Sequence, residues 1–448
     1  MSRRINKYGI WMLLLGTFSV TQVHFIGSIG ISELFVFVLA PFFFVKDYGA
    51  LRKHGFLPIV WLSLLVCLGC AVASASNQTP MLNFLRGLAS PYAIFSTLVI
   101  GHRIVSRDPA SVKWYPLGVA LSVTINIFVF QRSVELDMYA GGDTGLDAVE
   151  GVMSSPIFWV GRLYAWMNVP IRGWYLQTPI LYSFFAPISF AVFAMLTTTS
   201  GRSAAAIAIG ASFLTLLGGK KKSQMRSMAR KFWFLAVMAL LLIQCMTFAY
   251  KQAALSGVLG EAALKKYEGQ VASKGKNGGV LATLMGGRLE FFVGAYACLQ
   301  KPIIGFGPWA VDEDGYYEDF LYKYGSQEDF ERYLKSSQDL ARQGVYRRML
   351  LPAHSHIIGF WQAHGIVGLV FWIYVLCHVV RYFRKDLATV PQWYGFVALT
   401  MPAFLWNMFF SPLADRTDVA MLLVVLMMTR AVRRGSVILP FSMVQEVK

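Results

Sequence analysis

The sequence predicts an all-α protein, a single domain of about twelve transmembrane helices that occupies residues 1–448. Hydrophobic residues make up 56% of the chain and charged residues only 15%, whereas soluble domains carry about 25% charged residues. Apolar runs of about 15 to 25 residues recur from end to end without alternating in polarity. Helical spans, rather than the alternating strands of a membrane barrel, are therefore expected.

The apolar runs define twelve predicted spans. The weakest is the sixth, which Arg162 and Asn168 interrupt. It is retained because, without it, the lysine-rich loop after the eighth span would face away from the other basic loops. The predicted spans are residues 8–26, 30–45, 57–75, 84–100, 115–130, 153–171, 179–197, 203–217, 232–250, 357–380, 393–410 and 417–432.

The net charge of +17 lies mostly in short loops between these spans. Positive residues mark the cytoplasmic side of a membrane protein, so both termini are predicted to be cytoplasmic. The charge therefore does not indicate nucleic-acid binding. No small-residue cleavage site follows the first apolar run, which we expect to remain as an anchor. The basic loops contain Arg3, Arg4 and Lys7; Lys46, Arg52 and Lys53; Arg103, Arg107 and Lys113; Lys220, Lys221, Lys222 and Lys231; Arg381, Arg384 and Lys385; and Arg430, Arg433 and Arg434.

The longest hydrophilic stretch, residues 251–352, lies between the ninth and tenth predicted spans and forms an outward cap. A helix is predicted from Arg288 to about Gln300, because its apolar residues fall at helical spacing. Pro302 should end this helix. A second cap helix is predicted over residues 327–343.

Isolated arginines occur on the outer, less basic side. Ser200 and Gly201 precede Arg202 and favour a turn into a helix N-terminus, where backbone N–H groups suit phosphate. Arg288 lies in the first turn of its predicted helix, where a cation opposes the helix dipole. A guanidinium group clamps phosphate through two parallel hydrogen bonds. The structural alternative for each arginine is an anchor at the membrane interface. The outer arginines include Arg86, Arg132, Arg202 and Arg416.

Two histidines, His354 and His356, directly precede the tenth predicted span. A histidine there could take a proton from a hydroxyl group. The alternatives are an interfacial pair that bonds backbone carbonyls and a metal site, but neither a carboxylate nor a cysteine lies nearby in sequence. The acidic turn at residues 312–314 is interpreted as solvated rather than calcium- or magnesium-binding. No metal and no cofactor is expected, and His364 is expected to pack in the core.

Three sequence motifs, in this order, resemble the O-antigen ligase and polymerase superfamily. The resemblance covers most of residues 200–380. Members often have His-Asn where this chain has His354-Ser355, and an acidic residue near Ala363 that is absent here. The motifs are Ser200-Gly201-Arg202-Ser203-Ala204; Gly287-Arg288 followed by Lys301-Pro302-Ile303-Ile304-Gly305-Phe306-Gly307; and His354-Ser355 followed by Gly365-Ile366-Val367-Gly368.

The resemblance implies a metal-independent, inverting glycosyltransferase of the bacterial inner membrane, with its active site facing the periplasm. The donor would be a glycan on undecaprenyl diphosphate. Arg202, Arg288 and Arg86 would bind the diphosphate, and His354 would be the general base. His356 and Arg416 are further candidates. Flippase and chain-length regulator proteins are implied as partners.

Two acceptors remain open under this resemblance. A polymerase would elongate another lipid-linked glycan, whereas a ligase would transfer the glycan to lipid A core. The tyrosine-rich stretch of the cap and the 407–416 segment favour a polymerase of an O-antigen or exopolysaccharide. The rival class is a transporter or flippase of lipid-linked glycan. Such proteins often show internal repeats and charges at mid-membrane, which this sequence does not.

Overall fold

The computed structural model describes residues 6–19, 22–24, 28–128, 248, 252, 255–256, 289–325, 330–331, 350–352, 355–385, 390, 393–410 and 416–437. Over these residues the fold is helical, with twelve α-helices, one 3₁₀ helix and one two-stranded hairpin. The predicted sixth to ninth spans lie outside the described residues, apart from position 248.

Several of the described helices are long and apolar enough to cross a membrane. They are α4 (Leu57–Ser76), α5 (Met81–Arg107) and the first 18 residues of α19 (Ile366–Lys385). A fourth span is formed if α2 (Ile31–Lys46) and α3 (Tyr48–His54), which meet at 80°, are counted together. The chain is therefore a multi-pass membrane protein, as the composition predicted.

Helix boundaries agree with the sequence for most of the described spans. The helices α6 (Trp114–Phe128), α20 (Tyr394–Phe410) and α21 (Arg416–Arg433) lie close to the predicted spans. The predicted cap helix is α15 (Leu289–Gln300), which ends before Pro302. A further cap helix, α16 (Tyr316–Tyr324), was not predicted. The helix predicted over residues 327–343 lies outside the described residues, apart from positions 330 and 331.

The first predicted span is wrong in its second half. Helix α1 (Lys7–Thr17) has 11 residues, a length of about 16 Å, which is too short to cross a hydrocarbon core of about 30 Å. The chain then forms an antiparallel hairpin of β1 (Gln22–His24) and β2 (Ser28–Gly30). Hydroxyl groups assist the helix end, since Thr17 and Ser19 donate to the carbonyls of Leu13 and Gly16.

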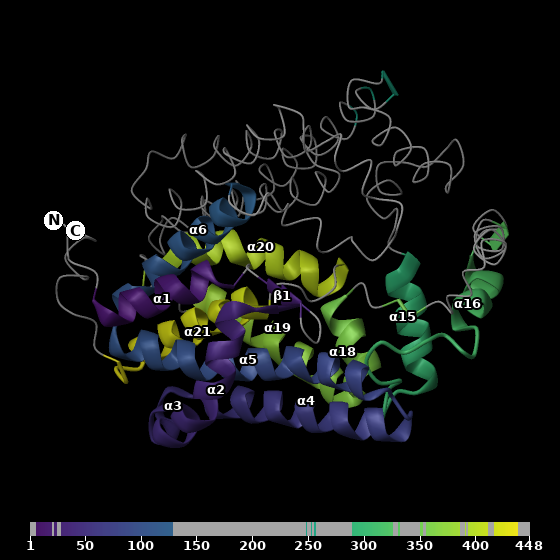
Figure 1. The fold of residues 1–448 in the computed structure, drawn as a ribbon, viewed down its shortest axis with the longest axis horizontal. Coiled ribbons are helices and arrows are strands. Elements are labelled where there is room, and N and C mark those ends of the chain that lie inside the picture. Colours follow the sequence, from purple (N-terminus) through teal and green to yellow (C-terminus); the bar gives the residue numbers. More distant parts are fainter. Residues whose placement is uncertain are drawn as a thin grey trace.

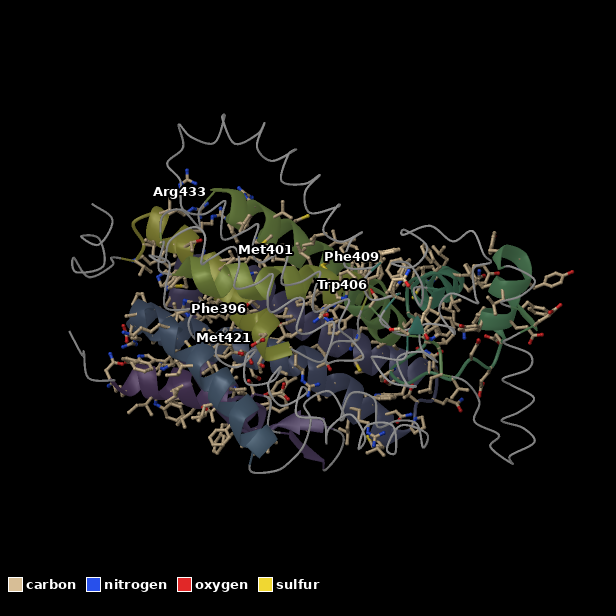
Figure 2. All side chains as sticks on the ribbon, turned by 90° about the horizontal axis from the view of Figure 1, so that it is seen from above. Phe396, Met401, Trp406, Phe409, Met421 and Arg433 are labelled. Carbon is tan, nitrogen blue, oxygen red and sulfur yellow. The ribbon has the colours of Figure 1, made fainter. Side chains whose placement is uncertain are left out.

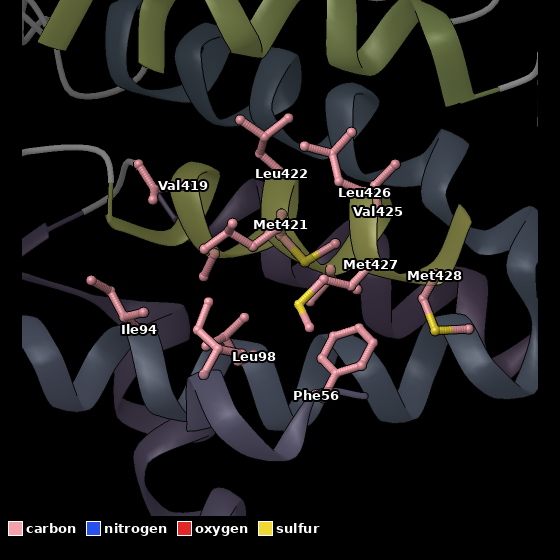
Figure 3. Packing of buried hydrophobic residues seen from close by; sticks show 14 of the residues in the cluster. Phe56, Ile94, Leu98, Val419, Met421, Leu422, Val425, Leu426, Met427 and Met428 are labelled. Carbon is pink, nitrogen blue, oxygen red and sulfur yellow. The ribbon is translucent and has the colours of Figure 1, made fainter. Parts of the chain in front are cut away.

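Helix α21 lies at the centre of the bundle, where every residue from Val419 to Thr429 is buried. It packs against α5 and Phe56 (Figure 3). Because lipid is as apolar as a protein core, close packing rather than water exclusion holds such helices together. Gly101 permits this contact, since a Cβ there would lie 3.0 Å from Met421 Sδ. Gly16 and Gly118 likewise bring α1 and α6 together, with a Cβ at Gly118 only 2.2 Å from the carbonyl oxygen of Leu13.

The bundle has a basic end and a cap end. At the basic end, Arg103 pairs with Asp47 at 2.5 Å, and the amide of Asn6 donates to Asp108 at 2.9 Å. Helices α15 and α16 lie at the opposite end from α3 (Figure 1). Along α20, Phe409 lies nearer to the cap helices and Arg433 of α21 lies at the far end (Figure 2). The described basic loops therefore share one end, as predicted from their charge.

We expect the cap end to face outward, because the opposite end is basic. In cells with a permeabilised outer membrane, an impermeant thiol reagent should label Tyr322→Cys in α16, whose side chain is 77% exposed. Lys53→Cys, exposed at the basic end, should not be labelled above the unmodified chain until the inner membrane is opened. The reverse pattern would overturn the topology and the outward-facing site.

Candidate functional site

Six residues were predicted to form the functional site. Three of them lie outside the described residues: Arg202, Arg288 and His354. The other three are described: Arg86, His356 and Arg416. The residues that directly follow Arg288 and His354 are described: Leu289 begins α15, and Ser355 is the N-cap of α18 (His356–His364). The starts of α15 and α18 are therefore the described parts of the chain next to two of the predicted site residues.

The predicted tenth span is not one helix but two. Helix α18 ends at His364 and α19 begins at Ile366, with Gly365 between them at φ +67° and ψ −158°. Only glycine adopts this region readily. The expectation of a continuous helix over residues 357–380 was therefore wrong, because apolar periodicity continues through a glycine whose backbone breaks the helix.

A loop of the cap, the 302–309 segment, fills this helix break. The N–H groups of Phe306 and Gly307 donate to the carbonyl of Gln362 at 2.7 and 3.2 Å, and the carbonyl of Ile303 accepts from the N–H of Ile366 at 2.9 Å. A broken helix exposes backbone groups that lipid cannot satisfy. The 302–309 segment therefore supplies hydrogen bonds that the break removes from the helix.

Glycines make this fit possible. A Cβ at Gly305 would lie 2.5 Å from the carbonyl oxygen of Gln362, and one at Gly365 would lie 2.1 Å from that of Ile303. The amide of Asn77, at the end of α4, donates to the carbonyl of Gly305 at 3.1 Å. Two motifs that lie far apart in the sequence, one in the cap and one before α19, thus form one packed unit.

Helix α15 packs closely on α18. A Cβ at Gly294 would lie 2.6 Å from the carbonyl oxygen of Pro352 and 2.7 Å from Cγ2 of Ile358, so a larger side chain would separate the helices. The thiol of Cys298 also approaches the carbonyl of Ile358, at 3.9 Å. Helix α15, which follows Arg288, is thereby fixed against the helix that follows His354.

The starts of α15 and α18 both contact the end of α20. In α15, the ring of Phe291 lies 6.4 Å from that of Phe410. Before α18, the hydroxyl of Ser355 donates to the carbonyl of Met408 at 2.8 Å and accepts from the N–H of Ile358. Phe291, three positions after Arg288, and Ser355, directly after His354, therefore contact residues two positions apart at the end of one helix, Phe410 and Met408.

Arg86 lies near the start of α5, beside the 302–309 segment. Its guanidinium carbon is 5.8 Å from the ring centre of Trp309, within cation–π range. The adjacent Gly87 contacts Pro308, since a Cβ there would lie 2.3 Å from Pro308 Cβ. Arg86 is thus placed next to the cap loop that fills the helix break.

Arg416 forms a buried ion pair. Its Nε and Nη2 donate to the two carboxylate oxygens of Glu33 at 2.6 and 2.9 Å, and Nη1 donates to the hydroxyl of Ser90 at 3.1 Å. The arginine and glutamate side chains are only 13% and 3% exposed. Arg416 therefore joins α21 to α2 and α5, and its two-pronged contact, the kind that a diphosphate would take, is made to Glu33.

The two described histidines of α18 face the protein interior. His356 is 1% exposed, and its ring packs 4.9 Å from that of Trp372. His364 is 3% exposed, and its ring nitrogens lie 3.1 Å from the carbonyl of Phe360 and 3.4 Å from that of Gly87. The predicted core position of His364 is confirmed, and His356 lies in the core as well.

The acidic turn before α16 caps that helix. Both carboxylate oxygens of Asp312 accept backbone N–H groups, from Tyr316 and Tyr317, at 2.8 Å. Burial and a hydrogen bond to Asp314 raise the pKa of the Tyr316 hydroxyl to about 12. Among the described residues, no group of three histidine, cysteine or acidic side chains is arranged to hold a metal ion.

A charged cluster links the two cap helices. The ammonium of Lys323 donates to Asp319 at 2.8 Å and to the hydroxyl of Tyr296 at 3.0 Å. The Lys323 ammonium, together with the Tyr296 hydroxyl, lowers the pKa of the Asp319 carboxyl, and this carboxylate raises the pKa of Lys323 in turn. Because these groups are exposed, the pair orients α16 against α15 and contributes little stability.

Sequence reasoning missed Glu33, Ser90 and Asn77. One signal could have identified Glu33: it is an acidic residue at the outer start of an apolar span, and a lone arginine was predicted on the same side of the membrane. Ser90 and Asn77 gave no such signal. No known protein family, curated protein or solved structure matches this chain.

Proposed function

We propose that this chain is a glycosyltransferase of the bacterial inner membrane that polymerises undecaprenyl-diphosphate-linked glycan repeats at the periplasmic face. The observation that supports this most is the shared contact at the end of α20. Phe291, three positions after Arg288, contacts Phe410, and Ser355, directly after His354, bonds Met408. A diphosphate clamp and a general base must act on the two sides of one sugar, so their chain neighbours should lie close together.

In the proposed reaction, the acceptor hydroxyl oxygen attacks the anomeric carbon of the donor sugar. The bond from this carbon to the diphosphate oxygen breaks as the new bond forms, with inversion at the carbon. His354 accepts the hydroxyl proton, and the diphosphate leaves with an added negative charge. Arg202 and Arg288 stabilise this charge, which develops in the transition state as the bond to the diphosphate oxygen breaks.

The proposal is tested with purified protein in detergent and a single repeat linked to undecaprenyl diphosphate. Product ladders are expected from the wild type. Arg202→Lys and Arg288→Lys keep the charge but lose the planar fork, so each should lower the elongation rate by on the order of 10². Arg433→Lys, exposed at the basic end, is the matched control and should elongate normally.

Other outcomes of this experiment would contradict the proposal. Transfer that requires lipid A core as the acceptor would make the protein a ligase. The helix break at Gly365 has counterparts in transporters, whose substrates bind at discontinuous helices. Movement of the lipid-linked repeat across proteoliposomes without any elongation would therefore replace the proposal with transport. Near-normal ladders from either lysine variant at wild-type expression would remove that arginine from the diphosphate site.

A further inference from the structure

We infer that Trp309 is a stacking platform for a pyranose ring of the glycan, with Arg86 beside it to hold a phosphate or carboxylate on the same glycan. The inference rests on the proposed function for the class of ligand. It adds a substrate contact that the sequence motifs do not contain, located where the 302–309 segment meets α5.

The backbone of Trp309 is strained. Its φ is +58°, in the left-handed region, and among the described residues the only other non-glycine there is Gln78. A bulky residue in this region is an outlier, and the other two left-handed positions of the 302–309 segment, Gly305 and Gly307, are glycines. Glycine would be unstrained at position 309 as well, so a tryptophan there calls for a role of the ring itself.

The two strained residues occur at one junction. Gln78 lies in the turn between α4 and α5, and its neighbour Asn77 donates to the carbonyl of Gly305. On its other side, the hydroxyl of Thr79 would lie 2.5 Å from a Cβ at Gly307. Strained backbone collects at ligand sites, because the surrounding structure must hold a geometry that the ligand requires.

The ring of Trp309 is open to a ligand. The residue is 54% exposed although it sits in a tightly packed loop. The face of an indole ring is electron-rich, and the face of a pyranose ring presents polarised C–H groups, so the two stack. The guanidinium group of Arg86, 5.8 Å from the ring centre, places a positive charge next to the stacked sugar. The pair therefore suits a sugar that carries or adjoins a negative charge.

The platform is held rigidly. Pro308 packs against Gly87, and the N–H of Gly307 is bonded to the carbonyl of Gln362. A rigid aromatic surface loses little conformational freedom when a ligand binds. The loop that carries Trp309 bonds α18 at Gln362, about 10 Å along the helix from Ser355. A glycan several rings long could lie on Trp309 while its reacting end reaches the proposed base.

The test uses the full-length protein in nanodiscs and a lipid-free oligosaccharide, namely the single repeat released by mild acid from the host's lipid-linked glycan. Binding is measured by calorimetry, and elongation is measured separately. Trp309→Ala and Trp309→Gly should weaken binding by about tenfold and raise KM more than they lower kcat. Trp309→Phe should retain most of the affinity. Trp309→Gly should melt no lower than the wild type, because glycine relieves the strain.

Trp11, 50% exposed in α1, provides the matched control, and Trp11→Ala should bind normally. A role for Trp309 as a membrane-interface anchor predicts unchanged binding in all Trp309 variants, and that result would overturn the inference, as would no binding to the wild type. Equal losses in the phenylalanine and alanine variants would overturn it too. If the wild type binds glycan through Trp309 but does not elongate it, the proposed function is wrong, whereas the inference that Trp309 binds glycan holds.

Discussion

His354→Ala is expected to abolish polymer formation while leaving expression and donor binding intact. A hydroxyl is a poor nucleophile until its proton is removed, and a well-placed base contributes about 10²–10⁴-fold in rate. His354 directly precedes Ser355, whose hydroxyl bonds the carbonyl of Met408 at 2.8 Å. Elongation by the purified variant, measured against pH, checks the prediction.

His356→Ala is the matched control, because it removes a histidine only two positions away. His356 is buried against Trp372, so its loss should lower stability through the cavity it leaves, by about 1–3 kcal/mol, with the rate per folded molecule largely kept. If the His356 variant were inactive and the His354 variant active, His356 rather than His354 would be the general base. Activity in both would remove histidine from the mechanism.

Gly365→Ala is expected to prevent the 302–309 segment from packing into the helix break. As a result, folded protein should not accumulate and activity should be lost. The backbone at φ +67° and ψ −158° is accessible almost only to glycine. A Cβ would also lie 2.1 Å from the carbonyl oxygen of Ile303, which accepts the hydrogen bond from Ile366. Strain and clash together should cost about 3 kcal/mol or more.

Two other glycines distinguish the cost of the backbone strain from the cost of the steric clash. Gly315 also has a left-handed φ, +71°, but a Cβ there would meet nothing within 4 Å, so Gly315→Ala should cost only about 1 kcal/mol. Gly49, in α3, has neither a left-handed φ nor neighbours within 4 Å, so Gly49→Ala should leave stability unchanged or raise it slightly. The check is the melting midpoint of the detergent-solubilised variants. If the Gly365 variant had the same melting midpoint as the Gly315 variant, the helix break at Gly365 would tolerate a side chain.

Local sequence features predicted much of the helical framework. The boundaries of α4 and α15 follow from an apolar run and from Pro302, respectively, because helix formation depends on residues three and four positions apart. The first span was predicted too long because its apolar residues continue past Thr17 into the β1–β2 hairpin. Apolar character alone does not distinguish a helix from a short hairpin.

The candidate site was predicted only as a set of residue types and not as an arrangement. Loop charge predicted that Arg86 and Arg416 would share one side of the membrane. It did not indicate that Arg416 bonds Glu33, which lies 383 positions away in the chain, while Arg86 lies beside Trp309. In the sequence, both are isolated arginines at the outer end of an apolar span. Only their partners in the structure distinguish them.

The sequence by itself determined the class of the protein, most helix ends and the common side of the described basic loops, because these depend on composition, periodicity and charge read along the chain. The tertiary structure decided the break at Gly365, the docking of the 302–309 segment into it, and the left-handed backbone of Trp309. These depend on backbone groups brought together from distant positions, such as Ile303 with Ile366 and Asn77 with Gly305. A glycine in an apolar run, Gly365, acquires its role in the fold only through those contacts.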